Sequence, residues 1–206
     1  MSKEAQLAKE ILDMALTLAQ HSSWEQLHLF DIARELNIGL EDIYRHYRQK
    51  DDLVEAWFDR ADRAMLCSAN ANDFHQKTIA ERLQYLILAW LDALALHKRI
   101  TGEMLWYKLE PGHIHLQLAA LLRISRTVQW FREAAGQDST NMTRIIEETG
   151  LSAIYIAVFV YWLNDGSDGQ EKTRDFLQQR LQQGGQCLQF WRSVIPISTA
   201  RSTEQT

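Results

Sequence analysis

Apolar residues recur three and four positions apart along most of this chain, and residues that form tight turns are scarce. With Gly 9 and Pro 2, these two residues make up roughly 5% of the 206 residues, against a usual share of about 12%. A chain with so few turn formers makes few tight turns, and a period near 3.6 is that of amphipathic helices. The sequence therefore predicts an all-α fold.

The length and composition limit the other classes of protein. A chain of 206 residues is one large domain or a small head with a larger body, and its 46% hydrophobic content is that of a globular protein. Cys67 and Cys187 are too few for a disulfide framework or a zinc site, and the N-terminus lacks an apolar signal core. The most apolar stretch, Leu151 to Leu163, is shorter than the about 20 residues that cross a bilayer. We therefore expect a cytoplasmic protein in which this stretch is a buried helix.

The first fifty residues have the pattern of a small three-helix head. Leu7, Ile11, Ala15 and Leu18 share one face of a first helix. Two short helical patterns follow, Leu29 to Leu36 and Leu40 to Tyr47, and only Asn37-Ile38-Gly39 separates them. Asn and Gly tolerate positive φ, so this spacing is typical of a helix-turn-helix unit.

The remainder is predicted to be a linking helix and a helical body. Leu53, Val54, Trp57, Ala61 and Met65 recur at helical spacing in a fourth helix after the head. Beyond the polar loop 69–77, further helices are expected at about 78–97, 99–109, 112–135, 140–164 and 170–192. We accordingly divide the chain into the head (1–50), the linking helix (51–70), a ligand-binding and dimerisation body (71–195) and a tail (196–206).

The segment Asp31 to Tyr47, followed by Lys50-Asp51-Asp52-Leu53, resembles the TetR family of bacterial transcriptional regulators. The resemblance implies a TetR-like fold in which Leu40 to Tyr47 is a recognition helix that enters the major groove of operator DNA. It implies that Tyr44, Tyr47 and Lys50 contact phosphates, whereas Arg45 and His46 reach base edges or phosphates. The candidate DNA-binding residues are Gly39, Leu40, Glu41, Asp42, Tyr44, Arg45, His46, Tyr47 and Lys50. From the residues alone, Tyr44 and Tyr47 could equally be core aromatics.

The head departs from that family in its charge and its helix caps. His28 and Gly39 stand where the family usually has a Ser or Thr cap, and Glu41 and Asp42 place two carboxylates on the recognition helix. Residues 1–66 hold 8 basic and 13 acidic side chains, a net charge of -5. Because carboxylates repel phosphates, we expect modest and steeply salt-dependent DNA binding through a local stripe of Arg45, Arg48 and Lys50.

The body is rich in aromatic residues, which either fill its core or line a gap for an apolar ligand. The candidate pocket residues are Trp90, Leu94, Met104, Trp106, Trp130, Tyr155, Phe159 and Trp162.

From Ala95 to Arg192 the chain also resembles the coenzyme Q biosynthesis lipid-binding protein family, which itself has a TetR-like fold. The matching residues are Trp130, Ala135-Gly136, Asp138-Ser139-Thr140, Leu151, Ala153, Tyr155, Trp162-Leu163-Asn164-Asp165-Gly166-Ser167, Thr173-Arg174-Asp175-Phe176-Leu177 and Arg180-Leu181. This resemblance implies an enclosed apolar lipid and a surface patch that docks a hydroxylase of the ubiquinone pathway. The patch is altered at Asn141, Arg144, Ile145, Glu147 and Glu148.

The last helix carries many glutamines, which form either a solvated face or part of a dimer interface. TetR-like proteins usually pair through their last two helices, so the resemblance implies a homodimer. His113 and His115 lie two residues apart, a spacing that points them to different sides of a helix, so we expect no metal site. No catalytic motif stands out, and we expect neither an enzyme nor a cofactor. Two functions stay open: a TetR-type regulator with a small apolar or lipid effector, and a lipid-binding accessory protein of ubiquinone biosynthesis that does not bind DNA.

Overall fold

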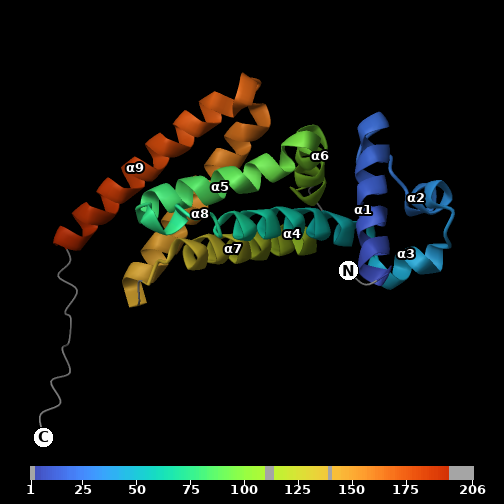
Figure 1. Cartoon of the computed structure of the whole chain (residues 1–206), viewed down its shortest axis with the longest axis horizontal. Helices are drawn as coiled ribbons and strands as arrows, with labels where there is room; N and C mark the ends of the chain where they lie inside the picture. The colour runs from blue at the N-terminus through green and yellow to red at the C-terminus, as the bar shows by residue number, and fades with distance from the viewer. Residues whose placement is uncertain (1–2, 110–113, 139–140, 195–206) are drawn as a thin grey trace, which may run out of the picture.

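A computed structural model describes residues 3–109, 114–138 and 141–194, and every regular element in these ranges is a helix. The expected all-α fold is confirmed. The molecule is elongated, with α1 to α3 at one end and the longer body helices at the other (Figure 1). The expected break at Pro111-Gly112 and the pair His113 and His115 lie outside the described backbone or side chains.

The head consists of three helices, α1 (Lys3–His21), α2 (Leu29–Leu36) and α3 (Leu40–His46). The turn between α2 and α3 begins at Asn37, whose φ of 53° is left-handed and whose N–H bonds back to the end of α2. Gly39, by contrast, has an ordinary φ of -79°. Asn37 alone therefore uses the conformational freedom that the sequence predicts for this turn.

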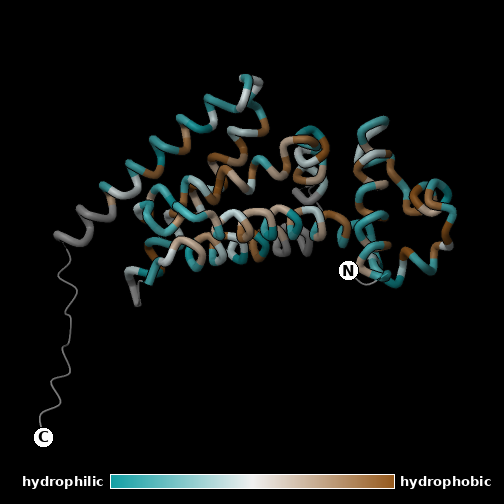
Figure 2. Tube along the Cα trace, viewed as in Figure 1, coloured by the Kyte–Doolittle hydropathy of each residue, from teal (hydrophilic) through white to brown (hydrophobic). Residues whose placement is uncertain are grey.

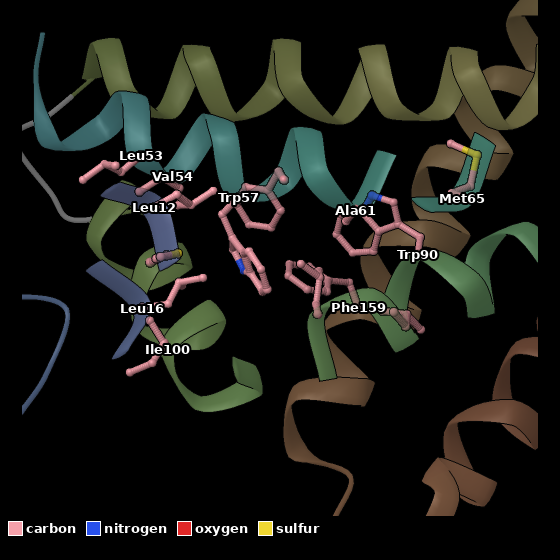
Figure 3. Packing of buried hydrophobic residues seen from close by; sticks show 14 of the residues in the cluster. Leu12, Leu16, Leu53, Val54, Trp57, Ala61, Met65, Trp90, Ile100 and Phe159 are labelled. Atoms are coloured by element: carbon pink, nitrogen blue, oxygen red, sulfur yellow. The ribbon is translucent and has the colours of Figure 1, made fainter. Parts of the chain in front are cut away.

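Helix α4 (Lys50–Ser68) joins the head to the body within one continuous core. Leu53 and Val54 at its start lie near Leu12 and Leu16 of α1, and Ala61 lies beside Trp90 of the body (Figure 3). Both groups are buried. The linking helix is thus shared by two packed regions and is not a solvated rod.

The body continues from α4 after a short turn, η1 (Phe74–Gln76). Its helices are α5 (Ile79–Leu94), α6 (Lys98–Leu109), α7 (Ile114–Ala135), α8 (Asn141–Asn164) and α9 (Glu171–Val194), with η2 (Ala95–His97) before α6 and η3 (Asp168–Gln170) before α9. The expected helix 78–97 is therefore two elements, because the chain tightens into a 3-10 turn at Ala95. Helix α9 runs along the outside of the body and is mainly hydrophilic, with apolar residues at intervals (Figure 2).

Helix α8 is more apolar over a longer stretch than Leu151 to Leu163. Residues Thr143–Asn164 are long and apolar enough to cross a membrane by length and composition, which corrects the shorter estimate from the sequence. One face of α8 packs into the core through Leu151, Tyr155, Val158 and Trp162. A core helix passes the same test of length and composition, so the finding is weak evidence for a membrane span.

The turn between α8 and α9 is held by one carboxylate. Asp165 accepts hydrogen bonds from the backbone N–H and hydroxyl of Ser167 and from the backbone N–H and hydroxyl of Thr173, at 2.6–2.9 Å. Burial alone would raise the pKa of the Asp165 carboxyl, but these four donors hold it well below its ordinary value. The Asp-x-Ser and Thr pattern in the sequence is thus an N-terminal anchor for α9.

Candidate DNA-binding head and ligand cavity

The outward face of α3 carries one aromatic and one cationic side chain that project into solvent. Ile43 packs inward and is 1% exposed, whereas Tyr44 is 60% exposed. Arg45 is also largely exposed and forms an ion pair with Asp42 at 3.0 Å. The guanidinium of Arg48 lies 6.0 Å from the centre of the Tyr44 ring. These three side chains form a cationic and aromatic surface, which suits contact with a nucleic-acid backbone.

Tyr47 differs from Tyr44 because its ring is buried and its hydroxyl is already used. The Oη atom donates a hydrogen bond to the carbonyl oxygen of Ala8 in α1 at 2.9 Å, and burial raises the pKa of this phenol. A contact from Tyr47 to phosphate would have to replace that bond. Tyr47 therefore fastens α3 to α1, which sets the angle at which α3 is presented.

Lys50 is likewise engaged inside the head. Its Nζ donates to the carbonyl oxygens of Glu25 at 3.1 Å and Leu27 at 2.8 Å, and it lies 5.2 Å from the ring centre of Trp24. Burial lowers the pKa of this ammonium group. Lys50 thus ties the start of α4 to the loop before α2, and its predicted phosphate contact would require these bonds to be exchanged.

Some of the acidic side chains in the head stabilise helix ends. His28 and Gly39 occupy the N-cap positions of α2 and α3 and provide no side-chain cap. Asp42 accepts from the Gly39 N–H at 3.0 Å, and Asp52 accepts from the Arg48 N–H at 2.8 Å. These carboxylates complete the first turns of α3 and α4 from within each helix. Their negative charge is therefore partly balanced locally.

The remaining predicted DNA-binding residues surround this surface. Leu40 and Glu41 are exposed on the first turn of α3, and His46 is half-buried at its end. The Glu41 carboxylate folds over Gly39, because a Cβ added there would lie 2.3 Å from Glu41 Oε2. The Glu41 charge therefore lies at the α3 N-terminus, where the helix dipole favours it.

The aromatic residues at the centre of the body pack against one another. Trp90 is fully buried, its ring centre 5.4 Å from that of Phe159 and 5.3 Å from that of Tyr155, both edge to face. Phe159 stacks on Trp162 at 5.8 Å. Leu94 and Met104 are fully buried as well. These six expected pocket residues fill space in the structure, as Figure 3 shows for Trp90 and Phe159.

The other two expected pocket residues lie at the surface. Trp106 is 72% exposed and Trp130 is 46% exposed. Neither one faces the central aromatic cluster from within the core, so the eight residues do not enclose a common space.

A buried charge network joins α4 to α7 beneath the aromatic cluster. Asp62 accepts from Trp90 Nε1 at 2.8 Å and from Thr127 Oγ1 at 3.1 Å, and it pairs with Arg123 at 2.7 Å. Burial raises the pKa of the Asp62 carboxyl, an effect that Arg123 opposes. The network fixes the end of α4 to the body, and the sequence alone gave no sign of it.

A cavity of about 610 Å³ lies at the end of the body away from the head. The N-terminal part of α5, the N-terminal half of α8 and the C-terminal half of α9 form its walls. The lining residues are Ile79, Ala80, Leu83, Gln137, Ile146, Glu147, Gly150, Leu151, Ile154, Arg180, Leu181, Gln183, Gly184, Gly185 and Cys187. None of the eight expected pocket residues is among them. Three glycines at helical positions were the signal in the sequence that could have located this space.

A solved structure with high sequence identity has the same fold as this chain. It is the TetR transcriptional regulator from Nitrosomonas europaea ATCC 19718, which is 42% identical and superimposes with a TM-score of 0.79 over 88% of this chain and 99% of that chain. The chain belongs to the TetR family. A TetR transcriptional regulator from Rhodococcus sp. RHA1 has 16% identity and a TM-score of 0.66 over 87% of this chain and 97% of its own, which supports the fold alone. No curated protein matches the sequence.

A second family also matches part of this TetR-family chain. The COQ9 family model matches residues 119–187, about a third of the chain. The resemblance to the coenzyme Q biosynthesis family is therefore confirmed for this part of the body. The stretch includes the Asp165 turn and all of the α8 and α9 residues that line the cavity.

Proposed function

We propose that this protein is a homodimeric transcriptional regulator that binds operator DNA through its heads and releases or binds it in response to a small apolar molecule in the body. The main support for this proposal is the exposed surface that Tyr44 and Arg45 of α3 form with Arg48, which follows α3 in the chain. Family membership supports the same function, since the relative from Nitrosomonas europaea is described as a transcriptional regulator.

The internal ties of the head support the presentation of α3 as a rigid unit. Tyr47 joins α3 to α1, and Lys50 joins α4 to the loop before α2. A fixed recognition helix loses little conformational entropy on binding, which favours affinity. Because residues 1–66 hold 8 basic and 13 acidic side chains, the affinity depends on the small local surface of Tyr44, Arg45 and Arg48 and should fall steeply with salt.

An apolar stripe on α8 supports pairing of two chains. Ile145, Ile156 and Val160 are 58%, 39% and 48% exposed. With Ala153, which is also exposed, they recur at helical spacing on the side opposite the buried Leu151, Tyr155 and Trp162. A second copy related by a two-fold axis would cover this stripe and place two heads on two half-sites.

Helix α6 supplies a route from the body to the head besides α4. Glu103 accepts from the Trp24 N–H at 2.6 Å, and Arg99 donates to the carbonyl oxygens of Ala19 and Gln20 at the end of α1. A ligand that prefers one arrangement of the body helices would therefore also bias the position of the heads. Its effect on DNA affinity can be no larger than its differential affinity for the two arrangements.

The test is a binding assay with a matched pair of arginine variants. The wild-type protein should retain fragments of its source genome at low salt, and Arg45→Ala should weaken binding to a selected fragment by about 10-fold to 100-fold. Arg34→Ala is the control, because Arg34 is equally exposed and also forms an i,i+3 ion pair with an aspartate. Equal losses for the two variants would contradict the role of Arg45, and no retention by the wild type would contradict DNA binding.

A second candidate function is that of a lipid-binding accessory protein of ubiquinone biosynthesis. The COQ9 match over residues 119–187 and the net negative head favour it. Organic extraction of the purified protein followed by mass spectrometry tests this candidate. A stoichiometric isoprenoid or phospholipid together with no DNA retention would replace the regulator by the accessory protein.

A further inference from the structure

We propose that the cavity at the far end of the body binds a neutral amphiphile, a molecule with an apolar chain and one hydrogen-bond donor such as a hydroxyl group. A regulatory role for this ligand rests on the proposed function. The ligand-binding test requires no DNA, so the proposed ligand and the proposed DNA binding can be contradicted separately.

The size of the cavity and its apolar walls define the larger part of the ligand. A volume of about 610 Å³ is within the range of small-molecule sites. Ile79, Leu83, Leu151, Ile154 and Leu181 provide aliphatic walls from α5, α8 and α9. An apolar chain placed among these side chains would leave water, which is the main favourable contribution to its binding.

Glycines keep this space open. A Cβ added at Gly150 of α8 or Gly185 of α9 would meet no atom within 4 Å. At Gly184, by contrast, an added Cβ would lie 3.1 Å from Ile154 Cδ1, so this glycine allows α9 to approach α8. The contact at Gly184 and the gaps at Gly150 and Gly185 together give the cavity its shape.

One unsatisfied acceptor defines the polar end of the ligand. Gly136 has a φ of 75° and ends α7, so that Gln137 enters the cavity wall. The Oε1 atom of Gln137 is buried and has no hydrogen-bond partner in the part of the chain that the structure describes. A buried acceptor without a partner is unfavourable, and a small rotation of the Gln137 amide toward the cavity would let a ligand hydroxyl satisfy it.

The charges around the cavity disfavour an anionic headgroup near Gln137. Glu147 lines the wall, is almost fully buried and lies 3.7 Å from Arg132. The lining cation, Arg180, is exposed, donates to Gln183 at 3.0 Å and lies over the Phe176 ring. Arg82, another cation near Gln137, donates to the carbonyl oxygens of Ala135 and His75. A carboxylate beside Gln137 would therefore face an acceptor and a carboxylate, while the nearby cations already have partners.

The cavity does not coincide with the α8 stripe that we assign to dimerisation. Glu147, Leu151 and Ile154 line the cavity from one side of α8, whereas Ile156 and Val160 lie on the outward side. A dimer formed through the stripe therefore does not require the residues that line the cavity.

Cys187 makes the test direct, because it lines the cavity and is exposed, whereas the exposed Cys67 lies on α4 outside the cavity. The rates at which both thiols of the full chain react with a chromogenic disulfide reagent are measured with 1-decanol and with decanoate. The variants Cys67→Ser and Cys187→Ser show which of the two measured rates belongs to which thiol. We expect decanol to slow the reaction of Cys187 at least fivefold and to leave the reaction rate of Cys67 unchanged. Decanol should also act at a lower concentration than decanoate.

Two variants test the assignment within the cavity. Gly150→Leu should fill the space and abolish protection by decanol, whereas Gly166→Leu, at an open position in the turn after α8, should preserve it. Gln137→Leu should raise the decanol concentration for half-protection about tenfold. Protection that survives Gly150→Leu, decanoate acting as well as decanol, or no protection by either compound would each overturn the proposal. The DNA-retention assay separately decides the proposed function.

Discussion

The body is solid at its centre and hollow at the end away from the head, although α5 and α8 form both regions. At the centre, the rings of Trp90, Phe159 and Trp162 pack against one another, and Asp165 fastens the start of α9. At the far end, Gly150 and Gly185 face open space. In this fold, large aromatic residues therefore indicate packing, whereas small residues on facing helices indicate room for a ligand.

The largest expected effect is in the solid centre of the body. Trp90→Ala should lower the free energy of unfolding by about 3–5 kcal/mol, because it leaves a void and removes the indole donor from Asp62. Denaturation by urea measures the change. Trp130→Ala, at a half-exposed tryptophan, is the control and should cost about 1 kcal/mol. Similar losses in the two variants would contradict the distinction between core and surface aromatics.

The Asp165 anchor should make stability depend on pH. Asp165→Asn should cost about 2–4 kcal/mol at neutral pH, because a buried carboxylate with four donors is replaced by a neutral group that has fewer acceptor sites. The depressed pKa of Asp165 contributes stability that is fully present above the unfolded value near 4. This contribution is lost progressively as the pH falls from there toward the lower folded-state value.

Urea midpoints between pH 6 and pH 3 measure this dependence. The wild type should lose more stability over this range than Asp165→Asn, and the exposed Asp168→Asn should behave as the wild type. Parallel curves for the wild type and Asp165→Asn would show that the carboxylate is not the anchor.

In the head, Lys50 can serve either as a structural tie or as a phosphate contact, and a substitution separates the two roles. Lys50→Met should retain the contact with Trp24 but lose the bonds to Glu25 and Leu27, at a cost of about 1–2 kcal/mol. If Lys50 acts only inside the head, the slope of log K for DNA against log salt should stay unchanged. A slope smaller by about one, with unchanged stability, would instead establish the phosphate contact. Lys9→Met on the exposed face of α1 serves as the control.

The smallest effect is expected at the hollow end. Gly150→Ala should leave stability unchanged or raise it by up to about 1 kcal/mol, because alanine favours the helix and its Cβ meets nothing. Gly184→Ala should be less stable than Gly150→Ala, since Ile154 must move. The difference between their urea midpoints is the readout, and a reversed order would contradict the described shape of the cavity.

The sequence predicted the helices and the head well, because periodicity and the Asn37 turn are local signals. It also predicted the break between helices 140–164 and 170–192, where the Asp165 turn lies and where the bonding partners are within eight residues of each other. The cavity could not be predicted in this way, since it arises from the distance between α5, α8 and α9. Trp90 and Phe159 were candidate pocket residues, but whether facing aromatics stack or stand apart depends on helix placement, which their spacing does not encode.

In the head, the sequence predicted the helices but not the contacts of individual side chains. The motif places Tyr44, Tyr47 and Lys50 at regular spacing, yet Tyr44 is exposed while Tyr47 and Lys50 bond to distant backbone carbonyls. Those carbonyls belong to Ala8, Glu25 and Leu27, which only the folded head brings close. Spacing therefore identified the element but not the use of each side chain.

A footprint on a fragment selected from the source genome shows directly whether this protein binds DNA as a dimer. We expect two protected half-sites related by two-fold symmetry, with centres about one helical turn or a whole number of turns apart. Their protection should weaken steeply as salt rises from low concentration. Absence of protection on every selected fragment at low salt, with the protein folded and dimeric, would contradict the claim that this chain is a DNA-binding regulator.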